Sequence, residues 1–219
     1  LPFTAVFALH AGDVVSDPDP AAYPAADEIL SQIPYPIYYA AGNHDEATAL
    51  QRYLLKQHNS TTPFDYTVEV NGAQLIVVDS NGPAVFPAGS VTPAQLEWLC
   101  NLCAAPDDRP LIVATHHNPL PVGIPWLDNY MGLTDGEDFH AALLPARHRL
   151  RGVFFGHVHQ NLTIQRDGIL YSSTLSTWEQ LHAWPGQTET IVDEAAEPGF
   201  SVVTITRDQT FIRRHRFKV

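Results

Sequence analysis

The pattern of apolar and polar positions changes character about two thirds of the way along the chain. Up to about residue 156, short apolar runs typical of buried strands alternate with segments that repeat apolar residues at helical spacing. Beyond that point the pattern predicts hairpins at 161–173 and 200–219 and a long loop at 172–199. The earlier part predicts strands at 3–9, 35–40, 110–115 and 151–156, helices at 21–32, 46–58, 92–103 and from about 135, a hairpin at 64–80 turning at Asn71-Gly72, and a loop at 116–134.

This order of elements predicts an α/β protein, more narrowly an α+β arrangement of four layers. Two mixed β-sheets are expected to be sandwiched between helices. The 219 residues suit one domain over 1–219, with a β-rich C-terminal part from about residue 160. Because 45% of the residues are hydrophobic and only 16% are charged, the chain can form a sizeable core. The apolar opening segment is interpreted as a buried strand, because it lacks the basic start and the cleavage site of a signal peptide.

Net charge and cysteine content limit the expected binding partners and the cellular compartment. A formal net charge of −12 argues against binding of a nucleic acid polymer, which needs clustered Lys and Arg. No apolar run approaches about 18 residues, so we expect no membrane span. Cys100 and Cys103 are interpreted as two buried thiols on a helix that begins at Thr92 and Pro93. So few cysteines are compatible with a reducing compartment, and we expect a cytoplasmic protein.

Four apolar strands end in side chains that can bind metal ions. Asp13 follows the first strand, and Asn43 and His44 follow the second within "GNHD". The motif "THHNP" places His116 and His117 after a third strand, and "GHVH" places His157 and His159 after a fourth. Because the carboxyl ends of strands in an open α/β sheet lie along one edge, these residues are expected to converge.

Imidazole and carboxylate together favour Zn, Mn or Fe over Ca or a thiolate-bound metal. Paired ions can clamp a phosphoryl group. Each motif taken alone has an ordinary structural interpretation as a turn, a helix cap or a surface loop, and the order and strand-end placement of all four favour a site. His10 is interpreted as a packing residue at a strand end.

The combined motifs resemble those of the calcineurin-like metallophosphoesterases, whose pattern is D-x-H, GD, GNH(D/E), H and GHxH. Within that family the chain is most similar to bacterial class III cyclic-nucleotide phosphodiesterases and related glycerophosphodiesterases. The segments "HHNPLPVGIPWLD" (116–128) and "VTPAQLEWL" (91–99) carry this narrower resemblance. The resemblance covers essentially the whole chain.

The resemblance implies a role for each matching residue. Two divalent metal ions of the Mn/Fe/Zn class are implied, with Asp13 as the bridging carboxylate. Asn43, His116 and His157 would complete one ion, and His159 would bind the other. His44 would contact the phosphate and protonate the leaving alkoxide, Asp45 would orient His44, and Asn43, His44 and His117 would face the substrate. A hydroxide bridging the ions would attack phosphorus in line.

One motif of the family pattern is missing, namely the first D-x-H. Asp138-Phe139-His140 has the letters but sits at a predicted helix start, so we interpret it as structural. Either the natural protein has an upstream segment that this sequence lacks, which the missing initiator Met favours, or the protein has lost half of its site. The fold would then lack its first strand and leave a sheet edge exposed.

The sequence therefore predicts a metal-dependent phosphoric ester hydrolase acting on small phosphodiesters, with 3′,5′-cyclic nucleotides such as cAMP first among them. A phosphodiesterase or glycerophosphodiesterase of broad specificity is the near alternative. A catalytically inactive binding module with the same fold is the alternative from another class. Trp178 and Trp184 of the long loop either stack on a base or cover the core. A homodimer is implied by the resemblance alone.

Overall fold

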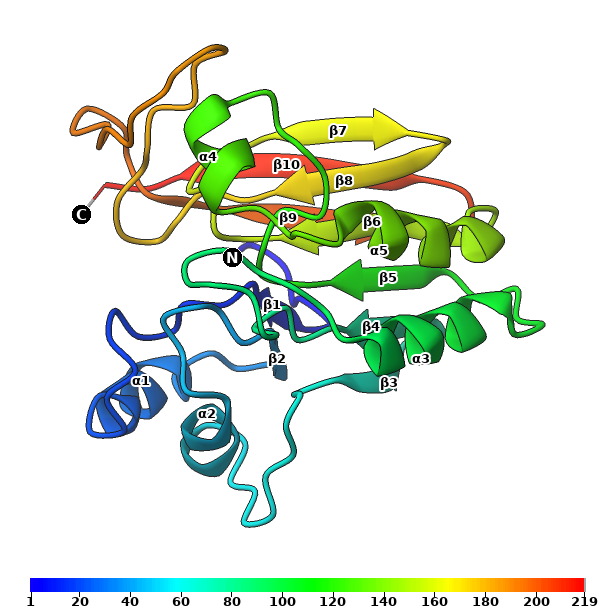
Figure 1. The fold of residues 1–219 in the computed structure, drawn as a ribbon. Helices are drawn as coiled ribbons and strands as arrows, with labels where there is room; N and C mark the ends of the chain where they lie inside the picture. Colours follow the sequence, from blue (N-terminus) through cyan, green and yellow to red (C-terminus); the bar gives the residue numbers. More distant parts are fainter. Residues whose placement is uncertain (219) are drawn as a thin grey trace.

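The computed structural model describes residues 1–218 and is built around a six-stranded mixed β-sheet (Figure 1). The strand order is β3-β4-β5-β6-β8-β7. The four inner strands pair in parallel, and an antiparallel strand closes each edge. The strands are β3 (Tyr66–Val70), β4 (Ala73–Val77), β5 (Leu111–Ala114), β6 (Leu150–Phe155), β7 (Thr163–Arg166) and β8 (Ile169–Ser173).

The second strand layer consists of two separate two-stranded sheets. One pairs β1 (Ala8–His10) with β2 (Ile37–Tyr39) in parallel, and the other pairs β9 (Gly199–Ile205) with β10 (Thr210–Arg216) antiparallel. A cleft of about 2120 Å³ runs between them and is lined by both β1 and β9. The layered α/β architecture agrees with the prediction, whereas the single second sheet that we predicted is divided in two.

The first predicted strand is shorter than expected. Pairing begins only at Ala8, and residues 1–7 are irregular although the prediction started a buried strand at residue 3. Phe3 and Val6 are about half exposed and line the cleft. Their apolar side chains therefore produced a strand pattern in a segment that has no pairing partner among residues 1–218.

Helices lie on one face of the six-stranded sheet and beside the small β1–β2 sheet (Figure 1). The helices α3 and α5 pack together on one face of the six-stranded sheet, and α1 and α2 lie beside the small β1–β2 sheet. The predicted loop at 116–134 was wrong in one part, because it contains α4, which is too short to show a helical period. The helices are α1 (Tyr23–Leu30), α2 (Ala47–Tyr53), α3 (Pro93–Ala104), α4 (Pro125–Tyr130) and α5 (Gly136–Leu143), followed by a 3₁₀ turn (Leu144–Ala146).

The local sequence signals at the turns and helix starts are confirmed. Asn71 and Gly72 have φ angles of 48° and 78°, which is the left-handed pair that a tight hairpin needs. Asp167 and Gly168 make the same kind of turn between β7 and β8. Thr92 caps α3 by accepting from the backbone N–H of Gln95, whose side chain accepts from Thr92 in return.

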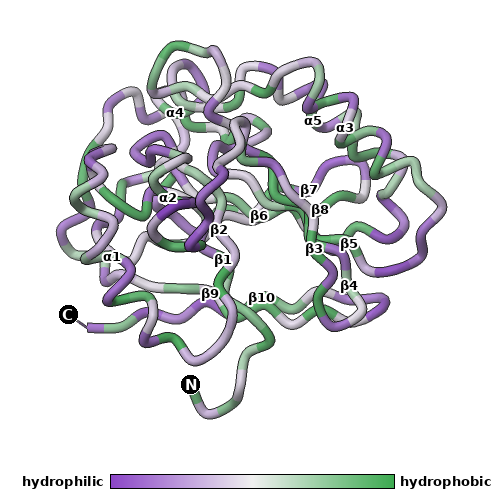
Figure 2. Tube along the Cα trace, turned by 90° about the horizontal axis from the view of Figure 1, so that it is seen from below, coloured by the Kyte–Doolittle hydropathy of each residue, from purple (hydrophilic) through white to green (hydrophobic). Residues whose placement is uncertain are grey.

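Two apolar cores hold the six-stranded sheet. The larger core lies against α3 and α5 and includes Leu99, Val113 and Phe139. The smaller core fills the opposite face with Ile112 and Ala114, against Ala40 beyond β2. Figure 2 shows green apolar stretches on the inner strands and mixed colouring along α3 and α5, as expected of helices with one buried face. Among residues 1–218, no helix has the length and apolar character to cross a bilayer.

The two cysteines differ in exposure, and the predicted pair of buried thiols was half wrong. Cys103 lies on the buried face of α3 with Gln95 and Leu99, whereas Cys100 points outward. Burial raises the pKa of the Cys103 thiol to about 12. The i, i+4, i+8 stripe that carries the packing therefore passes through Cys103 alone.

We expect one rapid thiol reaction per chain with a disulfide reagent such as DTNB in the folded state, from Cys100. A second equivalent should appear only in denaturant, because the Cys103 thiol is buried and protonated at neutral pH. The Cys100→Ser variant should show no rapid reaction. Two rapid equivalents from the native protein would contradict the packing of α3.

Candidate metal centre

The metal-capable side chains come from the carboxyl ends of two parallel strand pairs. Asp13 follows β1 and Asn43 follows β2, while His116 follows β5 and His157 follows β6. The structure brings all four together at one point. His116 Nε2 lies 2.9 Å from Asn43 Oδ1, 3.1 Å from His157 Nδ1 and 3.2 Å from Asp13 Oδ2.

These distances and atom types fit a single divalent cation. Ligand atoms bound to one ion at about 2.1 Å lie about 3–3.4 Å from each other in octahedral or tetrahedral geometry. The Asp13 and Asn43 oxygens can only accept hydrogen bonds, so the cluster attracts positive charge. Nitrogen and oxygen donors of this kind suit Zn, Mn or Fe.

A backbone carbonyl fixes which nitrogen of His116 faces the cluster. Its Nδ1–H donates to the carbonyl of Ala11 at 2.7 Å. Because a carbonyl can only accept, Nδ1 carries the hydrogen and Nε2 is turned to the cluster. Burial lowers the pKa of His116, but Asp13 outweighs burial and raises it. The charge of Asp13 would favour a divalent cation at this point in the same way.

Asp13 is held as an anion. Burial alone would raise its pKa, yet His116 and the backbone N–H of His44 bring the pKa of Asp13 below its ordinary range. That N–H donates to Asp13 Oδ1 at 3.0 Å, which leaves Oδ2 directed at His116. For His157, burial lowers the pKa well below the usual value, so the ring is neutral and able to bind a cation.

Three of the predicted ligands adopt left-handed backbone. Asp13, His157 and His159 have φ angles of 54°, 64° and 47°, which non-glycine residues rarely adopt. Such conformations cluster at functional sites, where the surrounding structure holds them in place. Asp13 and His157 both lie in the cluster, and His159 lines the adjoining cleft.

The glycines of the motifs permit close contact between the loops. A Cβ added at Gly42 would lie 2.1 Å from Asp13 Oδ1 and 2.3 Å from its backbone nitrogen. A Cβ at Gly12 would lie 2.3 Å from His116 Nδ1. Neither position can carry a side chain without moving a predicted ligand.

We expect Gly42→Ala to lower divalent-ion affinity by at least about tenfold, because displaced ligands of this kind typically cost 10- to 100-fold. The new methyl group must push Asp13 away from His116. Gly186→Ala is the matched control: Gly186 has φ of 81° but no atom near its added Cβ, so that variant should lose stability and keep its metal affinity. Zinc titration by calorimetry measures both. Equal affinities in the two variants would contradict this placement of Asp13.

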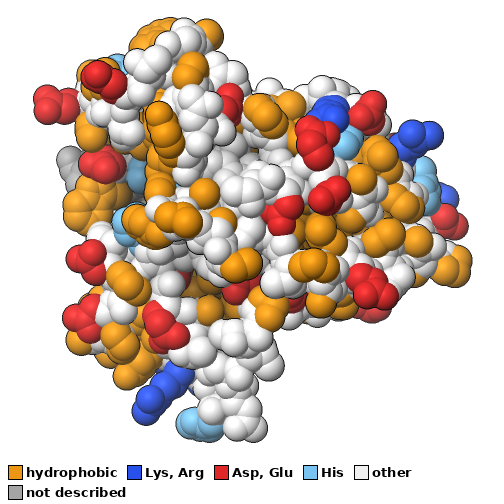
Figure 3. Space-filling view, viewed as in Figure 1, with side chains coloured by type: hydrophobic (Ala, Val, Ile, Leu, Met, Phe, Trp, Pro, Cys, Tyr) orange, Lys and Arg blue, Asp and Glu red, His pale blue; other side chains and the backbone are white. Residues whose placement is uncertain are grey.

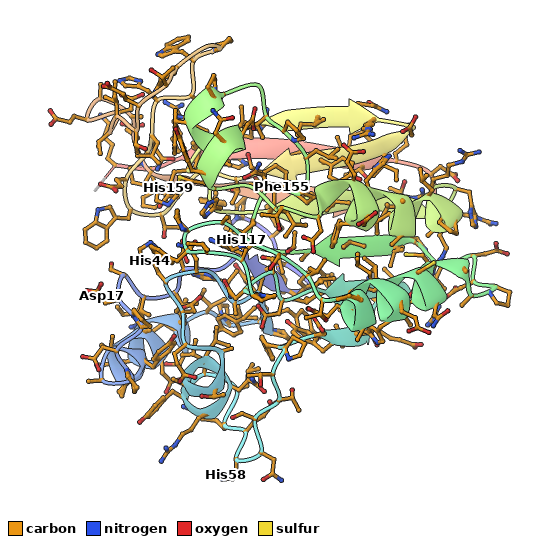
Figure 4. The ribbon with its side chains drawn as sticks, viewed as in Figure 1. Asp17, His44, His58, His117, Phe155 and His159 are labelled. Atoms are coloured by element: carbon orange, nitrogen blue, oxygen red, sulfur yellow. The ribbon has the colours of Figure 1, made fainter. Side chains whose placement is uncertain are left out.

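His44 stands at the opening of the cluster. Its Nδ1–H donates to the carbonyl of Ser16 at 2.6 Å, so Nε2 is the nitrogen that can exchange a proton. The ring is half buried and lines the cleft together with Asp13 and His159. Figure 4 shows His44 and His159 on opposite sides of this opening, with His117 deeper inside.

The contact predicted between Asp45 and His44 is replaced by a different one. Asp45 accepts from the backbone N–H groups of Gly42 at 2.9 Å and Val14 at 3.0 Å. It thereby joins the two loops that carry Asn43 and Asp13, while Ser16 orients His44. The sequence could not predict the bond between His44 and Ser16, because every residue has a backbone carbonyl and its identity gives no signal.

His117 is completely buried, and both of its ring nitrogens are engaged. Nδ1 bonds to the Ser80 hydroxyl at 2.7 Å, and Nε2 donates to the carbonyl of Pro87 at 3.1 Å. His116, His117 and His157 also lie close enough to form a three-histidine cluster. Since its nitrogens are already bonded, His117 supports its neighbours, and the direct substrate contact predicted for it finds no support in this geometry.

The second predicted ion has fewer ligands among residues 1–218. His159 lines the same cleft, and its Nδ1 is buried without a hydrogen-bond partner, as is Nε2 of His157. His10 stacks on Tyr39 with ring centroids 5.9 Å apart, and its Nδ1 is likewise unpartnered. His140 lies elsewhere, bonded to Tyr171 and Asp167, so Asp138-Phe139-His140 does not supply the missing motif.

Two supporting residues were missed from the sequence. The side-chain N–H groups of Asn81 donate to the carbonyls of Ala41 and Gly42 at 3.1 and 3.0 Å. The Tyr23 hydroxyl accepts from the backbone of Glu46 at 2.7 Å and lies 3.3 Å from Asp45. Asn81 stands just past a strand end, which is the signal that could have found it.

Comparisons with known proteins identify the family of this chain. The model of the calcineurin-like phosphoesterase family matches residues 2–161. Relatives include the 3′,5′-cyclic adenosine monophosphate phosphodiesterases CpdA of Escherichia coli K12 (30% identical; 91% of this chain and 70% of the relative) and of Pseudomonas aeruginosa (29%; 88% and 67%). A relative from Psychrobacter is 29% identical, and the chain spans only 59% of its length.

Solved structures show the same fold at low sequence identity. A dimetal phosphatase from Danio rerio superimposes with a TM-score of 0.64 at 11% identity, covering 95% of this chain and 83% of that one. GAP50, the anchor in the inner membrane complex of Plasmodium, gives 0.61 at 15% identity, covering 98% and 79%. These two likenesses establish the fold and leave the activity to be argued from the site.

The chain thus belongs to the calcineurin-like phosphoesterase family, a class of phosphoric ester hydrolases. The family assignment that the motifs implied is confirmed. Among its relatives are bacterial proteins named for the hydrolysis of cyclic AMP.

Proposed function

We propose that this chain acts in a metal-dependent phosphodiesterase that hydrolyses small phosphodiesters, with 3′,5′-cyclic nucleotides such as cAMP as the first substrate class. The carrying observation is the convergence of Asp13, Asn43, His116 and His157 within 3.2 Å contacts beside the exposed edge of His44. The names of the CpdA relatives support the choice of cyclic nucleotides.

Two divalent ions of the Mn/Fe/Zn class are part of the proposal. When bound, such ions neutralise phosphoryl charge and supply a nucleophile at neutral pH. Asp13, Asn43, His116 and His157 would hold the first ion. Asp13 and His159 would hold the second ion.

His44 is the proposed proton donor. Its Nδ1–H is committed to Ser16, so the only proton it can deliver is on Nε2, at the edge that lines the cleft. That proton would pass to the leaving alkoxide as the phosphorus–oxygen bond breaks. Asn43 contributes a neutral oxygen, which avoids adding negative charge where an anionic phosphodiester approaches.

We propose a small phosphodiester substrate in place of a nucleic acid polymer. In support, Lys and Arg side chains on the face shown in Figure 3 form no continuous patch and lie near its margins. The homodimer and the cytoplasmic location remain expectations from the family resemblance and the cysteine use.

A phosphodiesterase of broad specificity, including glycerophosphodiesters, is the near alternative. Its support is the volume of the cleft, about 2120 Å³, which would admit many leaving groups. A catalytically inactive binding module is the alternative from another class, supported by the incomplete second ligand set. The His44 ring, which lines the cleft, counts against it, because a scaffold has no need of a proton donor.

The test is elemental analysis of the purified chain combined with hydrolysis assays in added Mn²⁺. Substrates are cAMP, bis(p-nitrophenyl) phosphate and glycerophosphoglycerol. We expect bound divalent metal and hydrolysis of cAMP faster than of the aryl diester. Hydrolysis of cAMP no faster than of the aryl diester would favour the broad enzyme, and metal-free protein without turnover would favour the binding module.

A further inference from the structure

The opening of the metal centre carries exposed aromatic side chains that the chemistry described above does not use. Trp178 is 73% exposed and lines the cleft together with Asp13, His44 and His159. Phe86 is 64% exposed, and its ring lies 5.9 Å from the His44 ring in an edge-on arrangement. Large apolar side chains exposed beside a ligand-sized cleft are typical of ligand contacts.

The turn that carries Trp178 is held by hydrogen bonds of the Ser176 and Gln180 side chains. Gln180 is fully buried; its Nε2 donates to the carbonyl of Ser176 at 2.7 Å, and its Oε1 accepts from the Ser176 N–H at 3.1 Å. The backbone N–H of Trp178 donates to the Ser176 hydroxyl at 3.1 Å. The structure therefore holds an exposed indole on an ordered turn.

The same loop is tied directly to a predicted metal ligand. The backbone N–H of Leu181 donates to the carbonyl of His159, and the Gln160 side chain donates to the carbonyl of Leu181. The position of Trp178 is thus set relative to the "GHVH" turn. An indole placed in this way can lie against a group attached to a phosphate held at the centre.

We propose that Trp178 is a specificity-determining residue that stacks on the nucleobase of the substrate. A nucleobase offers a flat π face of the size of the indole, and base–aromatic stacking needs no sequence-specific hydrogen bonds. This inference deepens the proposed function and rests on it.

Trp184 provides a matched control within the same loop. It is 68% exposed, like Trp178, but it does not line the cleft. Removal of either indole takes away a similar exposed surface. Only removal of Trp178 should change recognition of a base.

The test is calorimetric binding of 5′-AMP and of ribose 5-phosphate, which lacks the base, to the Zn²⁺-loaded chain and its variants. We expect Trp178→Ala to weaken 5′-AMP binding by about tenfold, which corresponds to about 1.4 kcal/mol. Ribose 5-phosphate affinity should be unchanged, Trp178→Phe should restore most of the 5′-AMP affinity, and Trp184→Ala should match the parent.

Several outcomes would overturn the inference. One is an equal loss of affinity for 5′-AMP and for ribose 5-phosphate in Trp178→Ala. Another is a parent protein that binds 5′-AMP no more tightly than ribose 5-phosphate. A third is a loss of affinity for glycerophosphocholine in place of 5′-AMP, since an indole also attracts a quaternary ammonium. Hydrolysis of cAMP together with base-independent binding would refute base stacking and leave the proposed reaction standing. The expected binding pattern without any hydrolysis of cAMP would support base stacking and refute the proposed reaction.

Discussion

Replacement of His116 by glutamine is expected to lower divalent-ion affinity by more than about 100-fold and to abolish hydrolysis. His116 Nε2 is the atom that contacts all three other members of the cluster, at 2.9 to 3.2 Å. Loss of a ligand should exceed the 10- to 100-fold cost that outer partners alone carry. Zinc titration by calorimetry and metal content by elemental analysis give the two readouts.

His58→Gln is the control for this variant. This variant replaces the same type of side chain at an exposed position. His58 lies at the far end of the molecule from the candidate metal centre (Figure 4). It should bind metal as the parent does. Retention of metal in His116→Gln at parental affinity would show that the ion, if bound, lies elsewhere.

Replacement of His44 by glutamine is expected to lower kcat by about 10²- to 10⁴-fold on cAMP, the range typical of a lost general acid. Metal affinity should change little, because the His44 ring lies at the edge of the cluster and only its backbone N–H contacts Asp13. This separation of kcat from metal binding distinguishes a proton donor from a ligand.

The leaving group makes the role of His44 specific. A p-nitrophenolate leaves without a proton, so His44→Gln should lose far less activity on bis(p-nitrophenyl) phosphate than on cAMP. His148→Gln, an exposed histidine outside the cleft, should behave as the parent on both substrates. Equal losses on the two substrates in His44→Gln would rule out general-acid catalysis and leave a role in binding.

Much of the fold followed from local sequence rules. Asn71-Gly72 and Asp167-Gly168 determine their hairpins because both residues of such a turn need positive φ, and Thr92 with Gln95 begins α3 through reciprocal hydrogen bonds. The predictions that failed were those that depend on tertiary packing. The apolar residues before Ala8 line a cleft without forming a strand, and the exposure of Cys100 depends on how α3 is rotated on the sheet.

The convergence of Asp13, Asn43, His116 and His157 was also predicted, because strand ends concentrate polar residues at one sheet edge. Its supporting contacts were not. The carbonyls of Ala11 and Ser16, which fix His116 and His44, are backbone atoms without a sequence signature. The engagement of both nitrogens of His117 likewise depends on Ser80 and Pro87, which only the fold brings near.

The central claim is that Asp13, Asn43, His116 and His157 bind one divalent ion. The most direct measurement is the anomalous scattering of Zn²⁺ in crystals of the chain. Our account predicts a strong peak about 2.1 Å from a ligand atom of each of these four side chains. A peak bound by His117 in place of Asp13 and Asn43, or no peak at the cluster at saturating Zn²⁺, would contradict it.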